Sequence, residues 1–412
     1  MFSLLKMARR NLLRNKIRTV LTLGAIGSGM AVFMLMITLA TGSYVEMVRT
    51  AVSQQAGHVV VQAVDWQDQR EPTLLVPNAR EIDERIMRIA PDAIVTQRVL
   101  FGGSLMSSHN TAIAQMAGME PIDEAKVNTL DDKLITGEWL GEEDTRGIVI
   151  GSQMAERLDV EVKDKLVFMS QQKGQSETQS RLFRVRGVFE TGAASLDGFF
   201  VAVHIDAARE LLKTENGANQ VAVHLPVANM ADELTPHVVA MLAGEDLDVR
   251  HWKDAVPEIL GMIAVDKQSN DLIMMIMGMI VALGVLNAIL MSTLERTREF
   301  GVLMAVGMSG RKIAALVLME GALLGLFGML LGVALGYMPS LYLIETGLDF
   351  RDAMGETIET GGVAVSALIK GAWDWPRIGT YGVAVVLFTI LAAAWPAWRV
   401  TRLSPVDAMR HH

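Results

Sequence analysis

The sequence predicts an α+β integral membrane protein with four transmembrane helices and a large α+β domain of two subdomains, inserted between the first two helices. Composition is one reason, since 51% of the 412 residues are hydrophobic and 20% are charged. That is too apolar for an ordinary soluble protein and too charged for a fully embedded one. The other reason is segregation, because four separate apolar runs reach the roughly 20 residues that a bilayer crossing needs. They predict transmembrane helices at 17–42, 271–293, 313–339 and 378–398.

Residues 1–16 precede the first of these helices and predict an amphipathic helix along the membrane surface. Lys6, Arg10 and Arg14 recur at every fourth position. The residues on the opposite side are Leu5, Ala8 and Leu12. A solvated basic cap that only fixes topology is the simpler interpretation, and the two are compatible. A cleaved signal peptide fits less well, because the apolar run is too long and has no clear A-x-A cleavage site.

Basic residues predict the orientation of the chain. They gather before the first transmembrane helix, in the segment 294–312 and in the tail 399–412, whereas the longer segment 340–377 carries few. By the positive-inside rule both termini and 294–312 are cytoplasmic, and 43–270 and 340–377 lie outside. The net charge of −9 argues against nucleic acid as a partner. Cysteine is absent, which excludes disulfides and thiol chemistry.

The region 43–270 is long enough to bury its own core, and its patterns alternate between strands and helices. β-branched residues predict a strand at Gly57–Ala63. Ile82, Ile86 and Ile89 mark one face of a helix over Asn78–Ile89, behind an asparagine cap. A second helix is predicted at Ser152–Leu158, and further strands at Ile148–Gly151, Lys165–Ser170, Arg181–Phe189, Val201–His204 and Val221–His224.

Two of these strands predict a hairpin, because the polar segment Gln171–Ser180 joins them. His204 and His224 end two strands of similar sequence and would face each other if those strands were adjacent. A metal pair is then an option, but ordinary core or surface histidines are the more common outcome. We therefore predict no metal site.

The transmembrane helices are rich in small residues and in methionine. Glycines spaced by four along a helix let a neighbouring helix approach closely. The glycines expected to pack in this way are Gly321, Gly325, Gly328, Gly332 and Gly336. Flexible thioethers make an adaptable surface for acyl chains or varied apolar substrates, although ordinary packing is the alternative. The candidate substrate contacts are Met30, Met34, Met36, Met274 and Met277.

Glu320 is the one acidic residue well inside a predicted transmembrane helix. A carboxylate is costly there and faces a protein interior or an aqueous cavity. A proton relay would need a second carboxylate or a histidine well inside another transmembrane helix, and the sequence has none there. We therefore expect a structural hydrogen bond at Glu320 or a contact near the membrane surface.

Catalytic motifs are absent from the sequence. It contains no Gly-x-x-x-x-Gly-Lys-[Ser/Thr], so the chain cannot hold ATP phosphates in the usual way. It also lacks His-Glu-x-x-His and a dinucleotide-binding glycine fingerprint. The sequence therefore predicts a non-catalytic protein with no cofactor of its own.

Several segments resemble the permeases of the MacB/FtsX/LolC-LolE superfamily of ABC transporters. They are Ala8–Lys16, Gly284–Ser292, Glu295–Gly301, Met304–Gly307, Glu320-Gly321, Trp395–Arg399 and Ser404–Arg410. Within the superfamily, the lipoprotein-releasing LolC/LolE branch is the most similar. That likeness rests on Phe183–Gly192, Asp197 and Ala208.

The resemblance implies a mechanical function in a bacterial inner membrane, with 43–270 in the periplasm. A partner ATPase dimer would bind ATP and Mg²⁺, close beneath the membrane and press on the coupling helix, 294–312. Charges there would pair with the motor while Phe300 and Leu303 enter an apolar groove. The implied coupling residues are Glu295, Arg296, Arg298, Glu299, Phe300, Gly301, Leu303, Ala305 and Gly307.

The resemblance also implies further partners, namely a second copy or a related permease, a lipoprotein or lipid-anchored substrate, and a periplasmic carrier. In the LolC/LolE branch a hairpin recruits the carrier. Here the matching segment, Gln171–Ser180, is short and lacks proline, which puts carrier docking in doubt. Two other functions stay open, a MacB-like exporter of small molecules or peptides and an FtsX-like regulatory signalling subunit. The size of the region 43–270 weakens the second.

Overall fold

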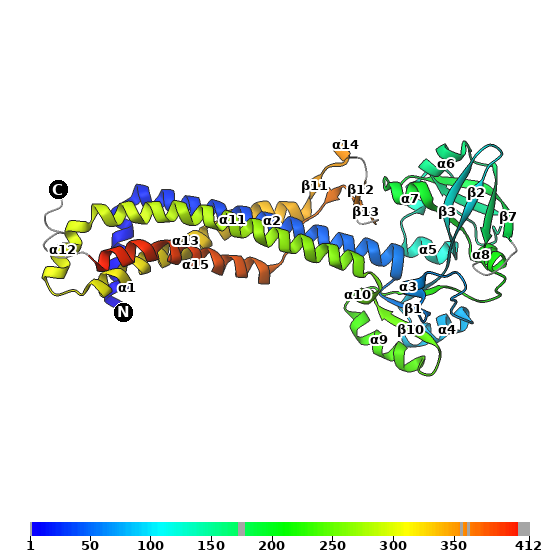
Figure 1. The fold of residues 1–412 in the computed structure, drawn as a ribbon, viewed down its shortest axis with the longest axis horizontal. Helices are drawn as coiled ribbons and strands as arrows, with labels where there is room; N and C mark the ends of the chain where they lie inside the picture. Colours follow the sequence, from blue (N-terminus) through cyan, green and yellow to red (C-terminus); the bar gives the residue numbers. More distant parts are fainter. Residues whose placement is uncertain (1, 172–177, 355–356, 361–362, 403–412) are drawn as a thin grey trace. The chain divides into compact units, whose positions relative to one another are not determined.

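Figure 1 shows the fold in a computed structural model, which describes residues 2–171, 178–354, 357–360 and 363–402. The chain divides into two compact units. The helical unit comprises 1–45, 264–348 and 369–412, and the α+β unit comprises 46–263 and 349–368.

Long apolar helices make up most of the helical unit. In the described part of the chain, four helices are long and apolar enough to cross a membrane. These four are α2 (Lys16–Ala51), α11 (Pro257–Glu295), α13 (Gly310–Glu345) and α15 (Trp375–Thr401). The shorter helices are α1 (Phe2–Arg14) before α2 and α12 (Thr297–Ala305) between α11 and α13.

The long helices extend beyond the apolar runs that predict them. Helix α2 continues to Ala51 where hydropathy ends it at 42, and α11 begins at Pro257 where hydropathy begins it at 271. Hydropathy marks only the part of a helix that suits a bilayer, whereas the helix itself ends at a breaker. No proline follows Pro257 in the polar turns of α11, so the helix passes through them.

The five glycines of α13 that were predicted to pack are all buried, and they face two neighbouring helices. A Cβ added to Gly321 or Gly325 would meet the side chain of Ala393 or Thr389 on α15. A Cβ added to Gly332 would lie 2.4 Å from the Cβ of Met30 on α2. Gly328 and Gly336 face α2 in the same way. These glycines therefore let both α15 and α2 pack closely against α13.

Ten strands form the main sheet of the α+β unit. They are β1 (Val59–Ala63), β2 (Ile94–Met106), β3 (Thr111–Met119), β4 (Leu134–Gly137), β5 (Gly147–Gly151), β6 (Lys165–Gln171), β7 (Thr178–Phe189), β8 (Phe200–His204), β9 (Gln220–His224) and β10 (Leu247–His251). Two short pairs lie outside it, β11 (Leu348–Asp349) with β14 (Leu368–Ile369) and β12 (Thr357–Thr360) with β13 (Val363–Ser366).

Helices cover this sheet. They are α3 (Trp66–Gln69), α4 (Ala79–Ile89), α5 (Pro121–Val127), α6 (Ser152–Leu158), α7 (Ala194–Phe199), α8 (Ile205–Leu212), α9 (Met230–Met241) and α10 (Trp252–Ala255). A π-helical turn (Val52–Ala56) follows α2, a 3₁₀ turn (Asp131–Lys133) precedes β4, and the short α14 (Arg351–Met354) follows β11. One apolar core runs through the unit and includes Val61, Ile86, Phe101, Phe168 and Val203.

The long strand β2 joins two groups of strands, which correspond to the two predicted subdomains. Its first half pairs with β9, which leads on to β1 and β10. Its second half pairs with β3 and β6. From β3 the ladder continues through β8, β5 and β7 and returns through β6 to β2. The second group is therefore a closed circuit of strands, and one continuous sheet passes through both groups (Figure 1).

Most of the predicted elements in this unit are confirmed. The strand predicted at Gly57–Ala63 is β1, and the helix predicted at Ser152–Leu158 is α6. Ile82 and Ile86 are buried on α4 as predicted, whereas Ile89, at the end of that helix, is exposed. The asparagine before α4 adopts a left-handed conformation and makes no side-chain cap. The predicted hairpin is β6 and β7, which pair as far as Gln171 and Thr178. Its tip, 172–177, lies outside the described residues.

The prediction that His204 and His224 could face each other is wrong. They end β8 and β9, and β2 and β3 lie between those strands in the sheet. His204 instead accepts a hydrogen bond from the backbone N–H of Asp206 and caps α8. His224 lies near His58, with ring centroids 6.5 Å apart. Similar sequence therefore did not mean neighbouring strands.

Candidate functional site

The turn between α11 and α13 is the first candidate site, and Glu320 organises it. This buried carboxylate accepts hydrogen bonds from Arg296 Nη1 at 2.9 Å and from Asn11 Nδ2 at 2.7 Å. Asn11 lies on α1, Arg296 immediately precedes α12, and Glu320 lies on α13. The expected structural hydrogen bond at Glu320 therefore joins three segments that are far apart in the sequence.

Two ion pairs add the first helices to this network. Arg14 Nη1 lies 2.5 Å from Glu299 Oε1, and Arg18 Nη2 lies 2.5 Å from Glu295 Oε2. Glu299 also accepts a hydrogen bond from Arg296 at 3.3 Å. Burial raises the pKa of Glu299, but the contacts with Arg14 and Arg296 outweigh it and hold that pKa below its usual value. The segment is thus linked to α1, α2 and α13 by charge.

Phe300 does not fit the role that the resemblance implies. Its ring has no exposed surface and belongs to the core of the helical unit, with Ile313 and Val317 among its members. The Arg296 guanidinium lies 5.0 Å from the ring centroid. A side chain held in this way cannot enter a groove on another protein without leaving its own core. Leu303 is half-buried against the same core.

A different apolar surface is available on α12. Val302 is 51% exposed, Val306 is 83% exposed, and Ala305 between them is also exposed. Arg298 and Glu295 are exposed charged residues of the same segment. Gly307, which follows α12, is exposed and has a φ of 101° that favours glycine. Of the other predicted coupling residues, Gly301 is buried, and Arg296 and Glu299 are partly buried.

The methionines named as substrate contacts pack inside the helical unit. Met30, Met34 and Met274 are buried, and Met36 and Met277 pack against the same core. The glycines of α13 explain two of these positions, since Gly332 faces Met30 and Gly336 faces Met34. Substrate contact at these five methionines stays a prediction, and ordinary packing stays its alternative. More exposed methionines in the described chain include Met275, Met279 and Met338.

A second polar cluster ties the opposite ends of three helices together, and the sequence analysis missed it. Tyr44 on α2 donates to Asp266 Oδ2 on α11 at 2.5 Å, and Asn270 donates to the Tyr44 hydroxyl at 3.0 Å. Asp271 on α11 accepts from Arg377 and from the Tyr381 hydroxyl, both on α15. The available signal was the polar stretch that ends at Asp271, which continues the helical spacing of α11.

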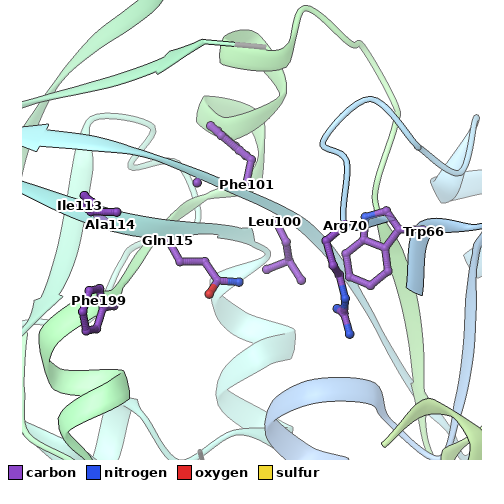
Figure 2. A pocket seen from close by; sticks show the side chains of 9 residues that line it. Trp66, Arg70, Leu100, Phe101, Ile113, Ala114, Gln115 and Phe199 are labelled. Atoms are coloured by element: carbon purple, nitrogen blue, oxygen red, sulfur yellow. The ribbon is translucent and has the colours of Figure 1, made fainter. Parts of the chain in front are cut away.

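The α+β unit contains a cavity of about 520 Å³ between β2, β3, α3 and α7. Figure 2 shows Arg70 beside Trp66 at one end, Leu100 and Gln115 in the middle, and Phe199 at the other end. The Arg70 guanidinium stacks 4.3 Å from the centroid of the Trp66 ring. The remaining lining residues are Phe101, Gly102, Ile113 and Ala114. An apolar wall with one cation suits an apolar chain that carries a negative group.

Among the described residues, no group of three or more histidine, aspartate or glutamate side chains could hold a metal ion. The buried carboxylate of the helical unit, Glu320, is paired with a cation and an amide.

Two family models match the chain. The MacB-like periplasmic core domain matches residues 19–236, which is more than half of the chain, and the FtsX-like permease C-terminal model matches residues 272–405. The chain belongs to the MacB/FtsX family of ABC-transporter permeases. It is thus a permease subunit with several membrane-spanning helices, and such subunits are not catalytic themselves.

Relatives of similar length lie in the lipoprotein-releasing branch. The chain is 22% identical over 397 residues to the lipoprotein-releasing system transmembrane protein LolC of Xylella fastidiosa, covering 94% of this chain and 92% of that protein. It is 22% identical over 416 residues to LolC of Neisseria meningitidis, covering 95% and 94%. It is 21% identical to LolE of Haemophilus influenzae over 363 residues, covering 82% and 84%.

Solved structures of isolated domains are also similar. The periplasmic region of MacB from Actinobacillus actinomycetemcomitans covers 51% of this chain and 95% of its own, with a TM-score of 0.37 and 14% identity. The extracellular domain of the ABC-type transporter YknZ from Gram-positive bacteria covers 47% and 99%, with a TM-score of 0.36 and 14% identity.

Proposed function

We propose that this permease subunit converts ATP hydrolysis by a separate ATPase dimer into movement of its α+β unit. The observation that carries the proposal is the Glu320 network. Because Arg296 and Asn11 both bond to Glu320, a push on the α12 segment reaches α1 and α13 directly. The pair Arg18–Glu295 passes the same push to α2. ATP and Mg²⁺ would be held by the ATPase alone.

The contact with the ATPase is proposed on the exposed side of α12. Val302, Ala305 and Val306 would enter an apolar groove, and Arg298 would pair with charges at its edge. This assignment replaces Phe300 as the inserted side chain. It keeps Phe300 as the support that holds α12 against the helical core.

The proposed substrate is a lipoprotein or another lipid-anchored molecule of the bacterial inner membrane. The relatives named LolC and LolE match nearly the full chain, which supports this class over small-molecule or peptide export. The α+β unit would lie in the periplasm, with both termini in the cytoplasm, as the basic residues predict. A second copy or a related permease would complete the transporter. We do not propose that a periplasmic carrier binds the β6–β7 hairpin.

The test is purification of the chain from its native membrane, with mass spectrometry of the proteins that accompany it. We expect an ATPase, a second permease and triacylated lipoproteins. Val306→Asp should release the ATPase, because a buried carboxylate in an apolar groove is costly. Val239→Asp is the matched control, since Val239 is an exposed valine on α9. An ATPase that stays bound to Val306→Asp would refute the proposed contact, and its absence from the wild type would refute the function.

A further inference from the structure

Arg98 is buried in the α+β unit and bonds in four places. Its Nε and Nη2 atoms donate to the two carboxylate oxygens of Glu124 on α5, at 3.2 Å and 2.6 Å. Its Nη1 donates to the backbone carbonyl of Gln54 at 2.8 Å, and Nη2 also donates to the carbonyl of Ser53 at 2.9 Å. Arg98 is 3% exposed and Glu124 is 1% exposed. The pair is therefore sealed from water.

The two carbonyls belong to the π-helical turn that ends α2. The last carbonyls of a helix lack partners within it and carry partial negative charge. A guanidinium presents its donors in a planar fork, so one side chain can reach a carboxylate and two carbonyls together. Lysine offers a point charge and could not match this geometry. Single π-helical turns are rare and are found frequently at functional sites.

Only the π-helical turn, Gly57 and His58 separate the end of α2 from strand β1. Gly57 follows the turn with a φ of 67°, and a Cβ there would lie 2.9 Å from the backbone nitrogen of Val223. Strand β1 begins at Val59. The chain itself thus fastens α2 to β1, which belongs to the group of β9, β1 and β10. This covalent attachment reaches only one of the two groups of strands.

Arg98 lies where β2 passes from one group to the other. Its Cα pairs with Gln220 on β9 in one direction and with Met119 on β3 in the other. Without Arg98, the closed circuit of strands would connect to α2 through the first group of strands, along the ladder between β9 and β2 and through contacts of α8 such as Arg209 with the Gly217 carbonyl. With Arg98, the end of α2 is fastened directly to β2 and, through Glu124, to α5.

We propose that Arg98 is a positioning residue that fastens the end of α2 to β2 and α5, so that displacement of α2 moves both groups of strands together. This inference rests on the proposed function for its role in transport. The fastening itself is independent of transport, and it can be measured in the resting protein.

The informative variant is Arg98→Met combined with Glu124→Leu. Removing both charges leaves no unpaired buried ion, so the fold is expected to survive. The chain has no cysteine, so Arg49→Cys on α2 and Lys126→Cys on α5 would introduce its only two sites for spin labels. In the full complex, electron–electron measurements of the distance between the two labels should give a narrow distribution when Arg98 and Glu124 are both present. The double variant should give a clearly broader one.

Transport provides the second readout. In the complete complex with its ATPase, the double variant should retain ATP hydrolysis and release at least about fivefold less substrate per ATP, the lower end of typical coupling between sites. Arg98→Lys should give a release per ATP between that of the wild type and that of the double variant. Arg209→Met is the matched control, because Arg209 is 2% exposed and bonds to Gly217 and Gln97 without contacting the end of α2. It should leave release per ATP unchanged.

Two results with the double variant would overturn the proposal. One is a distance distribution that stays narrow in the double variant, and the other is a broadened distribution with release per ATP unchanged. An equal loss in Arg209→Met would also overturn it, since the effect would then follow from any buried arginine. A wild-type complex without ATP-dependent release would refute the proposed function, and the distance measurement alone would then decide the fastening.

Discussion

The two units hold their buried charges in different ways. In the helical unit, Glu320 belongs to a network whose members are partly exposed and share partners, so Arg296 bonds both Glu320 and Glu299. In the α+β unit, Arg98 and Glu124 form one sealed pair, with two backbone carbonyls bonded to Arg98 and the Asn128 amide bonded to Glu124. A shared network at a surface can rearrange when a partner binds. A sealed pair cannot, which suits a fixed attachment between elements.

The largest expected effect is on the sealed pair. Arg98→Met alone should lower the free energy of unfolding of the α+β unit by about 3–5 kcal/mol, because it leaves the Glu124 carboxylate buried and unpaired. Adding Glu124→Leu should restore most of the loss. Chemical denaturation followed by circular dichroism measures both. If the single variant were as stable as the double variant, Glu124 would have another route to solvent, and the contrast between the units would disappear.

The second expected effect concerns the helical unit, where buried glycines, and not a buried ion pair, hold neighbouring helices close together. Gly332→Ala places a methyl group 2.4 Å from Met30 Cβ and 2.6 Å from the Gly27 carbonyl. Overpacking of this kind should lower stability by up to about 3 kcal/mol. Gly24→Ala is the matched control, since nothing lies within 4 Å of its added Cβ. Thermal unfolding in detergent should separate the two, and equal melting temperatures would show that α2 and α13 can move apart freely.

The third expected effect is a response to acid in the α+β unit. Burial and the nearby Arg98 and His58 lower the pKa of His224 to about 3. The unfolded chain binds this proton near pH 6.5 and the folded chain does not, so stability falls as the pH drops from about 6.5 toward 3. At pH 5 the loss should be about 2 kcal/mol.

His224→Gln should flatten this pH dependence, and the exposed His109→Gln should leave it unchanged. Unfolding free energies at pH 7.5 and pH 5 give the comparison. His58 and His251 also have lowered pKa values because of burial, so some slope should remain in the His224 variant. An unchanged slope would mean that His224 is protonated in the folded protein.

The sequence predicts features that depend on periodicity and misses those that depend on tertiary neighbours. Apolar length located the four long helices of the described chain, β-branched residues located β1, and a polar segment between two strands located the β6–β7 hairpin. The burial of Phe300 was missed because one aromatic residue in a charged turn gives no sign of its neighbours. Glu320 was recognised because a carboxylate in an apolar run is conspicuous by itself.

Arg98 could not be recognised from the sequence. It stands in a strand among polar and apolar residues, and its acidic partner lies on a later helix. Its other partners are carbonyl groups, which every residue carries and no sequence pattern marks. The strand order was hidden for a related reason, since the similar sequences of β8 and β9 say nothing about the strands between them.

The smallest expected effect is at the exposed edge of the helical network. The Arg14 side chain is 70% exposed and that of Glu299 is 40% exposed, so their pair should contribute only about 0.2–1 kcal/mol. Because the pKa of Glu299 is lowered in the folded protein, this contribution is present above pH 4.5 and is lost as the pH falls through the folded pKa. At neutral pH, Arg14→Gln should therefore speed hydrogen exchange in α1 by at most about fivefold.

Salt makes this small effect informative. Raising the ionic strength to 1 M shortens the screening length to about 3 Å, so it should speed exchange in wild-type α1 as much as Arg14→Gln does. The same salt should leave exchange around Arg98 unchanged, because that pair is sealed from water. Asn11→Ala is the control, since its bond to Glu320 involves a neutral donor and should persist in salt. If salt did not change hydrogen exchange in α1, the Asn11–Glu320 bond alone would hold α1 in place. The part of the network that can rearrange would then be the pair Arg18–Glu295.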